Sequence, residues 1–133
     1  MTQSRVYDCL IVGGGIAGLQ AAIQLGRYSV HQVLVVDAGY GRSTLCRQYH
    51  NLLGFPDGIS GEELRGRGRR QAESYGVEFV LDKATGAEKR EGQFRVNTSG
   101  GREYAGKTLL LSLEVGANYL FINWNYLYFH FKC

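Results

Sequence analysis

A glycine-rich turn between two apolar segments constrains this chain more than any other feature. Residues 6–12 (VYDCLIV) form a short run of strand length, of the kind that suits a parallel strand buried on both faces. From Ile16 onward the apolar residues recur at the helical spacing i, i+3, i+4 and i+7 instead. The junction contains four glycines: Gly13, Gly14, Gly15 and Gly18. The sequence therefore predicts a strand, a tight turn and a helix.

A second strand follows this helix. Residues 26–31 turn the chain, and residues 33–37 (VLVVD) have the composition of another buried strand. Two parallel strands joined by a helix cross over with right-handed connectivity. We therefore predict an α/β fold built on a Rossmann-type βαβ unit.

The glycines of the turn fit the pattern G-x-G-x-x-G. Gly13 permits a tight turn, Gly15 lets the backbone approach a pyrophosphate, and Gly18 lets the helix pack closely against the strand. The helix N-terminus directs N–H groups and a partial positive charge toward phosphates. Asp37 ends the second strand, where a carboxylate can accept hydrogen bonds from a ribose diol. The pattern predicts a dinucleotide site, and the alternative is a glycine-rich turn without a ligand.

The motif alone does not separate FAD from NAD. The acidic Asp37 argues against NADP, because the 2′-phosphate of NADP is better accommodated by an arginine.

A helix start is well marked in the middle of the chain. Ser60 and Glu63 form the capping-box pattern S-x-x-E after a glycine-containing loop. The helix is predicted to run from about Gly61 to Tyr75 and to end at Gly76.

Four arginines in this helix allow two interpretations. The stretch RGRGRRQ (65–71) is the kind of basic run that binds nucleic acid. No other basic or aromatic stripe supports that interpretation, so a solvated cationic helix face is favoured and no nucleic-acid partner is predicted. The arginines concerned are Arg65, Arg67, Arg69 and Arg70.

The second half of the chain has a β pattern. Apolar residues recur at every second position over residues 77–82 and 94–97, and glycines mark the turns between such runs. We predict short strands in a β-meander, followed by a buried strand over residues 108–112.

Composition limits the remaining possibilities. The chain has 133 residues, which suits one domain, and its net charge of +3 is too small to imply nucleic acid. The start MTQSRVYD has no apolar leader, and the three cysteines form no CxxC and no zinc spacing. The three histidines are scattered too. We therefore predict a cytoplasmic chain with no metal site and no membrane segment.

Several stretches, taken in order, resemble the N-terminal FAD-binding region of the pyridine nucleotide-disulfide oxidoreductases. The likeness is closest to thioredoxin reductases and covers roughly residues 6–112. The matching stretches are YDCLIVGGGIAGLQAA, VLVVDAG, HNLLGFPDGISGEEL, QAESYGVEF and TLLLS.

This resemblance implies FAD as the cofactor, with its pyrophosphate on residues 13–18 and its adenosine ribose on Asp37. Within that turn the residues implied are Gly13, Gly15, Ile16, Ala17 and Gly18. Further residues implied beside the cofactor are Ala38, Gly39, Arg42, Asn51 near the flavin ring, and Val80 through backbone contact with the adenine. In such relatives NAD(P)H is the electron donor.

The chain also departs from the family. Where the family's first segment usually ends in LLLATG, this sequence has LLLSLEVG, so that Glu114 replaces the glycine or Gly116 takes its part. Residues 1–112 are therefore assigned to the FAD-binding domain and residues 113–133 to a divergent, aromatic-rich tail. That tail could also be a strand that completes the sheet.

The family's second dinucleotide domain and its CxxC have no counterpart in this sequence, so the fold is expected to be incomplete relative to the family. Two functions remain open. One is the FAD-binding portion of an NAD(P)H-dependent oxidoreductase; the other is a non-catalytic nucleotide-binding module or truncated fragment. No side chain is predicted to be catalytic. Beyond FAD, a second copy of the chain or a full-length relative is the partner considered.

Overall fold

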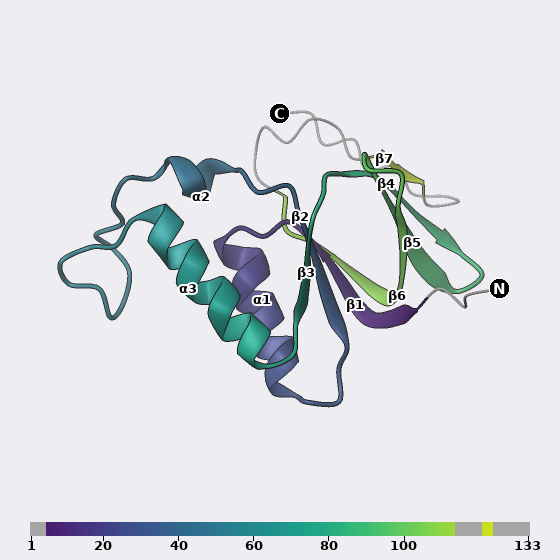
Figure 1. Ribbon diagram of the computed structural model, residues 1–133, viewed down its shortest axis with the longest axis horizontal. Coiled ribbons are helices and arrows are strands. Elements are labelled where there is room, and N and C mark those ends of the chain that lie inside the picture. Colours follow the sequence, from purple (N-terminus) through teal and green to yellow (C-terminus); the bar gives the residue numbers. More distant parts are fainter. Residues whose placement is uncertain (1–4, 114–120, 124–133) are drawn as a thin grey trace.

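A computed structural model describes residues 5–113 and 121–123 and has an α/β architecture (Figure 1). Within these residues seven strands form one sheet in the order β3-β2-β1-β6-β5-β4-β7. The elements in chain order are β1 (Val6–Val12), α1 (Ile16–Arg27), β2 (Val33–Asp37), α2 (Arg42–Leu45), α3 (Gly61–Ser74), β3 (Glu78–Leu81), β4 (Ala84–Arg90), β5 (Gln93–Thr98), β6 (Glu103–Leu111) and β7 (Phe121–Asn123).

The first half of the sheet is parallel. β1 pairs with β2 on one side and with β6 on the other, so that Ile11 lies opposite both Val35 and Leu110. β3 extends the parallel sheet beyond β2. The chain reaches β2 from β1 through α1, and β3 from β2 through α2 and α3. The predicted Rossmann-type βαβ unit is confirmed, with the predicted strand boundaries.

Helix α3 begins at the predicted Gly61 and ends within one residue of the predicted end. Ser60 is its N-cap, and its hydroxyl accepts a hydrogen bond from the Glu63 N–H at 3.1 Å. Gly76 follows with φ of +82°, the left-handed conformation that ends a helix at low cost for glycine.

The second half of the sheet is an antiparallel meander of β4, β5 and β6. The prediction that residues 77–82 belong to this meander was wrong, because β3 pairs in parallel with β2 instead. An alternating pattern identifies a strand without identifying its neighbour. The predicted burial of residues 108–112 was also wrong for Thr108 and Leu111, which are exposed.

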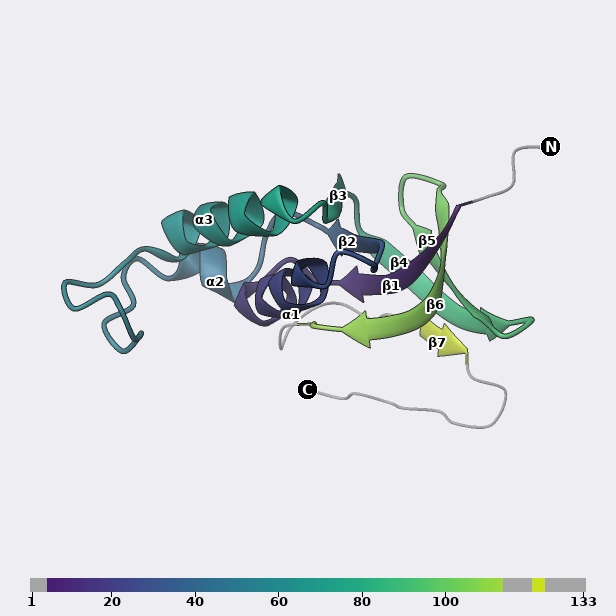
Figure 2. The ribbon, with the colours of Figure 1, turned by 90° about the horizontal axis from the view of Figure 1, so that it is seen from below.

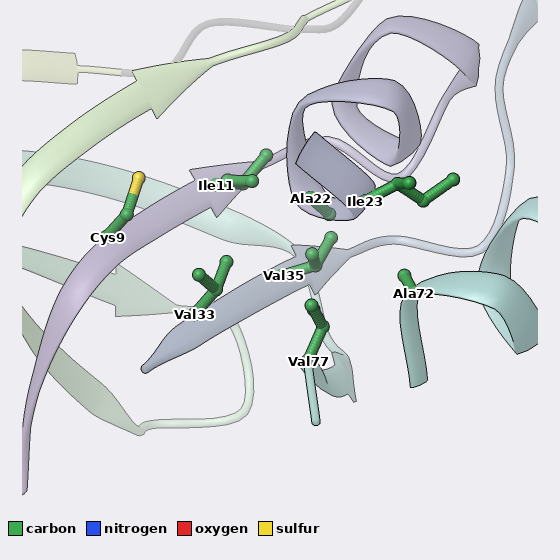
Figure 3. Close-up of a cluster of buried hydrophobic side chains, with 8 residues drawn as sticks. All are labelled: Cys9, Ile11, Ala22, Ile23, Val33, Val35, Ala72 and Val77. Carbon is green, nitrogen blue, oxygen red and sulfur yellow. The ribbon is translucent and has the colours of Figure 1, made fainter. Parts of the chain in front are cut away.

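β1 and β2 are covered on both faces. On one face α1 and α3 pack over a cluster that contains Ile11, Val35 and Ala72 (Figure 3). On the other face the meander contributes Ala87 and Val96 to a second cluster. This double coverage explains why the sequences of β1 and β2 are almost continuously apolar rather than alternating.

Part of the predicted tail joins the sheet. β7 pairs in parallel with β4, over residues 86–88 of that strand. Glu114 and Gly116 lie outside the described residues, as does most of the 113–133 segment. The assignment of residues 113–133 as a divergent tail therefore stays a prediction.

Candidate dinucleotide site

Gly13 lies where three parallel strands end. Its φ is +108°, and its N–H donates to the Val36 carbonyl oxygen at 2.9 Å. A Cβ on Gly13 would overlap the carbonyl oxygen of Ser112, just beyond β6. Ser112 is itself held by a 2.8 Å hydrogen bond from its N–H to the Val12 carbonyl oxygen. Both the backbone conformation and the space therefore require glycine at this position.

Gly18 brings α1 onto the turn. A Cβ there would overlap the Gly13 carbonyl oxygen, so the predicted close approach of helix and strand is confirmed. Gly15 is the N-cap of α1, and within the described residues no side chain caps it. The first turn of α1 contains no acidic residue, and it begins with half-buried Ile16 and exposed Ala17. Backbone N–H groups at this helix start are suited to a phosphate group.

Asp37 lies beside the turn, at the carboxyl end of β2. A Cβ on Gly14 would overlap the Asp37 carboxyl group, so the glycine backbone and the carboxylate are neighbours. Asp37 Oδ1 accepts a hydrogen bond from the Gly39 N–H at 3.0 Å. Gly39 has φ of +85°, and half-buried Ala38 lies between it and Asp37. The structure thus brings the predicted phosphate and ribose residues together.

A further residue at this site was missed from the sequence. Arg65 of α3 forms an ion pair with Asp37, with 3.0 Å between Arg65 Nη2 and Asp37 Oδ2. Arg65 Nη1 also donates to the Ser43 hydroxyl at 2.9 Å. Only 11% of the Arg65 side chain and 16% of the Asp37 side chain are exposed. The prediction that Arg65 lies on a solvated face was therefore wrong.

Two other arginines of the helix fit that prediction. Arg67 and Arg69 are about half exposed and pair with glutamates four residues away on the same helix, Glu63 and Glu73 respectively. Arg65 differs because it shares the inward-facing helix stripe with Gly61, Gly68 and Ala72 at spacings of three and four residues. That spacing was the available signal, and the positive charge concealed it.

Three predicted residues remain: Arg42, Val80 and Asn51. Arg42 begins α2, five residues after Asp37. Val80 lies opposite Val36 in the β2–β3 register, one position before the pair formed by Asp37 and Leu81. Asn51 is exposed in the loop between α2 and α3, which projects away from the sheet in both views (Figure 1, Figure 2). The placement of Asn51 near the flavin ring stays a prediction.

Other types of site find no support in the described part of the chain. Residues 5–113 and 121–123 contain no cluster of potential metal ligands. In the same ranges, no helix has the length and apolar character needed to cross a bilayer.

The parallel strands, the glycine turn and the acid at the end of β2 have the arrangement of the Rossmann-type dinucleotide-binding fold. Residues 7–122 match the sequence profile of the pyridine nucleotide-disulphide oxidoreductases. The chain belongs to this family, as the resemblance implied.

Individual relatives agree with this assignment. A thioredoxin reductase of Aquifex aeolicus is 35% identical over 109 residues, which is 81% of this chain and 34% of the relative. Among solved structures, an oxidoreductase of Agrobacterium tumefaciens is 38% identical with a TM-score of 0.73, covering 80% of this chain and 36% of that one. A thioredoxin reductase of Gloeobacter violaceus is 29% identical with a TM-score of 0.72, covering 79% and 33% respectively. The chain spans about a third of the length of these relatives.

Proposed function

We propose that this chain binds FAD and is the FAD-binding portion of an NAD(P)H-dependent flavoprotein oxidoreductase similar to thioredoxin reductase. One observation carries the proposal: the contact between the glycine turn and Asp37 at the carboxyl ends of β1 and β2. A pyrophosphate and a ribose diol are adjacent in the ADP half of FAD, and the two groups that would bind them are adjacent here. The membership in the oxidoreductase family supports the choice of a flavin cofactor.

The residues of the chain would bind and orient the cofactor rather than react with it. The flavin ring of bound FAD would accept a hydride. The N–H groups at the start of α1 would donate to the pyrophosphate, and Asp37 would accept from the ribose hydroxyls. By the family resemblance, Ala38, Gly39 and Arg42 would lie along the cofactor. Asn51 would lie near the flavin ring, and the backbone of Val80 near the adenine.

The ribose role of Asp37 gives a direct test. Asp37→Asn removes the charge and is expected to weaken FAD binding by about 1–3 kcal/mol, because a hydrogen bond to a charged acceptor is lost. Titration with FAD and with NAD, followed by flavin fluorescence and calorimetry, measures the change.

Asp57→Asn is the matched control, because Asp57 is exposed in the loop between α2 and α3. Thermal unfolding of each variant without ligand separates a loss of folding from a loss of binding. Equal FAD affinities in the wild-type chain and in folded Asp37→Asn would contradict the assignment of Asp37 to the ribose.

The second candidate is a non-catalytic nucleotide-binding module. The contact between the glycine turn and Asp37 supports it equally, because that contact bears on nucleotide binding and not on electron transfer. Such a module would bind FAD or NAD and would not pass electrons from NADPH to a disulfide. Turnover of a disulfide with NADPH by the 133-residue chain would rule out this candidate.

A further inference from the structure

Arg65 connects three elements at the proposed ribose site. It extends from α3, contacts Asp37 at the end of β2, and donates to Ser43 of α2. Gly61, one turn earlier in α3, makes this possible, because a Cβ there would overlap the Ser43 carbonyl oxygen. The close contact between α2 and α3 places the guanidinium group beside the Asp37 carboxylate.

The pair holds the carboxylate in one orientation. Arg65 Nη2 lies 3.0 Å from Asp37 Oδ2 and 3.4 Å from Oδ1, and the Gly39 N–H holds Oδ1 from another direction. A carboxylate has about four lone-pair sites on its two oxygens. Among the described residues, Oδ2 accepts a hydrogen bond from Arg65 alone, which leaves acceptor capacity on the oxygen that lies beside Gly14.

The charge of Arg65 also matters for a dinucleotide. A pyrophosphate is anionic, and an unpaired Asp37 next to the turn would repel it. The Arg65 guanidinium offsets the charge of Asp37 at short range and with little exposure to solvent, so that salt screens the interaction weakly. Asp37 could then accept from a ribose without making the phosphate position unfavourable.

We propose that Arg65 is a positioning residue for the adenosine ribose, which fixes Asp37 toward the 2′,3′-diol and neutralises its charge. This inference rests on the proposed dinucleotide-binding function. It predicts that recognition of the ribose hydroxyls depends on a residue that need not touch the ligand.

The test compares ADP with 2′-deoxy-ADP, because only ADP carries the 2′-hydroxyl. The wild-type chain is expected to bind ADP about tenfold or more tightly than 2′-deoxy-ADP, the size of one hydrogen bond to a charged group. In Arg65→Gln this ratio should fall toward one, and FAD affinity should fall with it. Calorimetric titration of the purified 133-residue chain measures all three ligands.

Arg67→Gln is the matched control, since the Arg67 side chain is about half exposed, forms an ion pair with Glu63 and lies over the Phe55 ring. It should leave both the ADP to 2′-deoxy-ADP ratio and the FAD affinity unchanged. Should Arg65→Gln fail to fold, Arg65→Lys keeps the charge without the planar guanidinium fork and should give a reduced ratio.

Different outcomes separate this inference from the proposed function. A folded Arg65 variant that keeps the wild-type preference for ADP would overturn the positioning role while leaving dinucleotide binding intact. A wild-type chain that binds neither FAD nor ADP would contradict the proposed function itself. A merely structural role for Arg65 would lower stability without changing the ratio.

Discussion

Gly13 in the turn after β1 and Gly92 in the turn between β4 and β5 both have positive φ, +108° and +76°. Their surroundings differ. A Cβ on Gly13 would overlap the Ser112 carbonyl oxygen, whereas one on Gly92 would meet no atom of the described residues within 4 Å. The parallel half of the sheet therefore uses glycine for close approach at the proposed site. At Gly92 the meander uses glycine for backbone conformation alone.

This comparison predicts the largest effect at Gly13. Gly13→Ala combines an unfavourable backbone conformation with a backbone clash, and we expect it to lower the free energy of unfolding by about 4 kcal/mol or more. Gly92→Ala has the conformational cost alone, about 1–2 kcal/mol. Urea unfolding of the two variants measures the difference.

The two substitutions control for each other, because each adds one methyl group to a glycine of positive φ. Equal losses of stability would show that close approach at Gly13 contributes little, and that the contrast between the two regions is wrong. FAD binding should persist in Gly92→Ala.

The hydrogen bond between Tyr7 of β1 and Glu78 of β3 gives the parallel half of the sheet a predicted pH dependence. Tyr7 of β1 belongs to the core cluster shared with the meander, and its hydroxyl donates to Glu78 Oε2 of β3 at 2.7 Å. Burial and the neighbouring Glu78 raise the pKa of Tyr7 from 10.0 to about 12. The folded state therefore holds the phenol proton more tightly than the unfolded state does.

The stabilisation from this proton should be complete below pH 10 and lost as pH rises toward about 12. This difference in pKa corresponds to about 3 kcal/mol. Tyr7→Phe removes the titrating group, so the free energy of unfolding of the variant should fall less steeply across that range. Parallel curves for the wild type and Tyr7→Phe in urea unfolding would contradict the assignment.

The sequence predicted β1, β2 and α3 better than it predicted the place of β3 in the sheet. The boundaries of β1 and β2 follow from continuous apolar runs, and α3 follows from its N-cap Ser60 and the terminating Gly76. These signals are local. The partner of β3 depends on a contact with β2 some forty residues earlier, which an alternating pattern cannot specify.

The residues of the candidate site also divide into those marked by a local motif and one whose place depends on distant packing. Gly13, Gly18 and Asp37 could be predicted because their motif lies within one βαβ unit. Arg65 was missed although its helical spacing indicates the inward face, because its burial also depends on how closely α3 approaches α2, and that approach is set by Gly61 and Ser43. A charged side chain is usually exposed unless a buried partner of opposite charge pairs with it. Asp37 is that partner for Arg65.

The smallest predicted effect lies in the meander turn itself. Glu91 has φ of +53° beside Gly92, and the flanking Arg90 and Gln93 pair across the two strands. Two successive residues of positive φ are the mark of a type I′ hairpin turn, which favours Asn-Gly. Glu91→Asn should raise the free energy of unfolding by about 0.5–1 kcal/mol, because asparagine tolerates this conformation better.

Glu91→Gln is the control for that change, because it removes the charge and keeps the unsuited backbone preference, and its stability should stay close to that of the wild type. FAD affinity should be equal in all three proteins, because the turn lies at the end of the sheet away from α2 and α3 (Figure 2). A gain in Glu91→Gln as large as that in Glu91→Asn would mean that charge, not backbone conformation, limits this turn. The meander would then differ from the glycine turn after β1 in its electrostatics as well as in its packing.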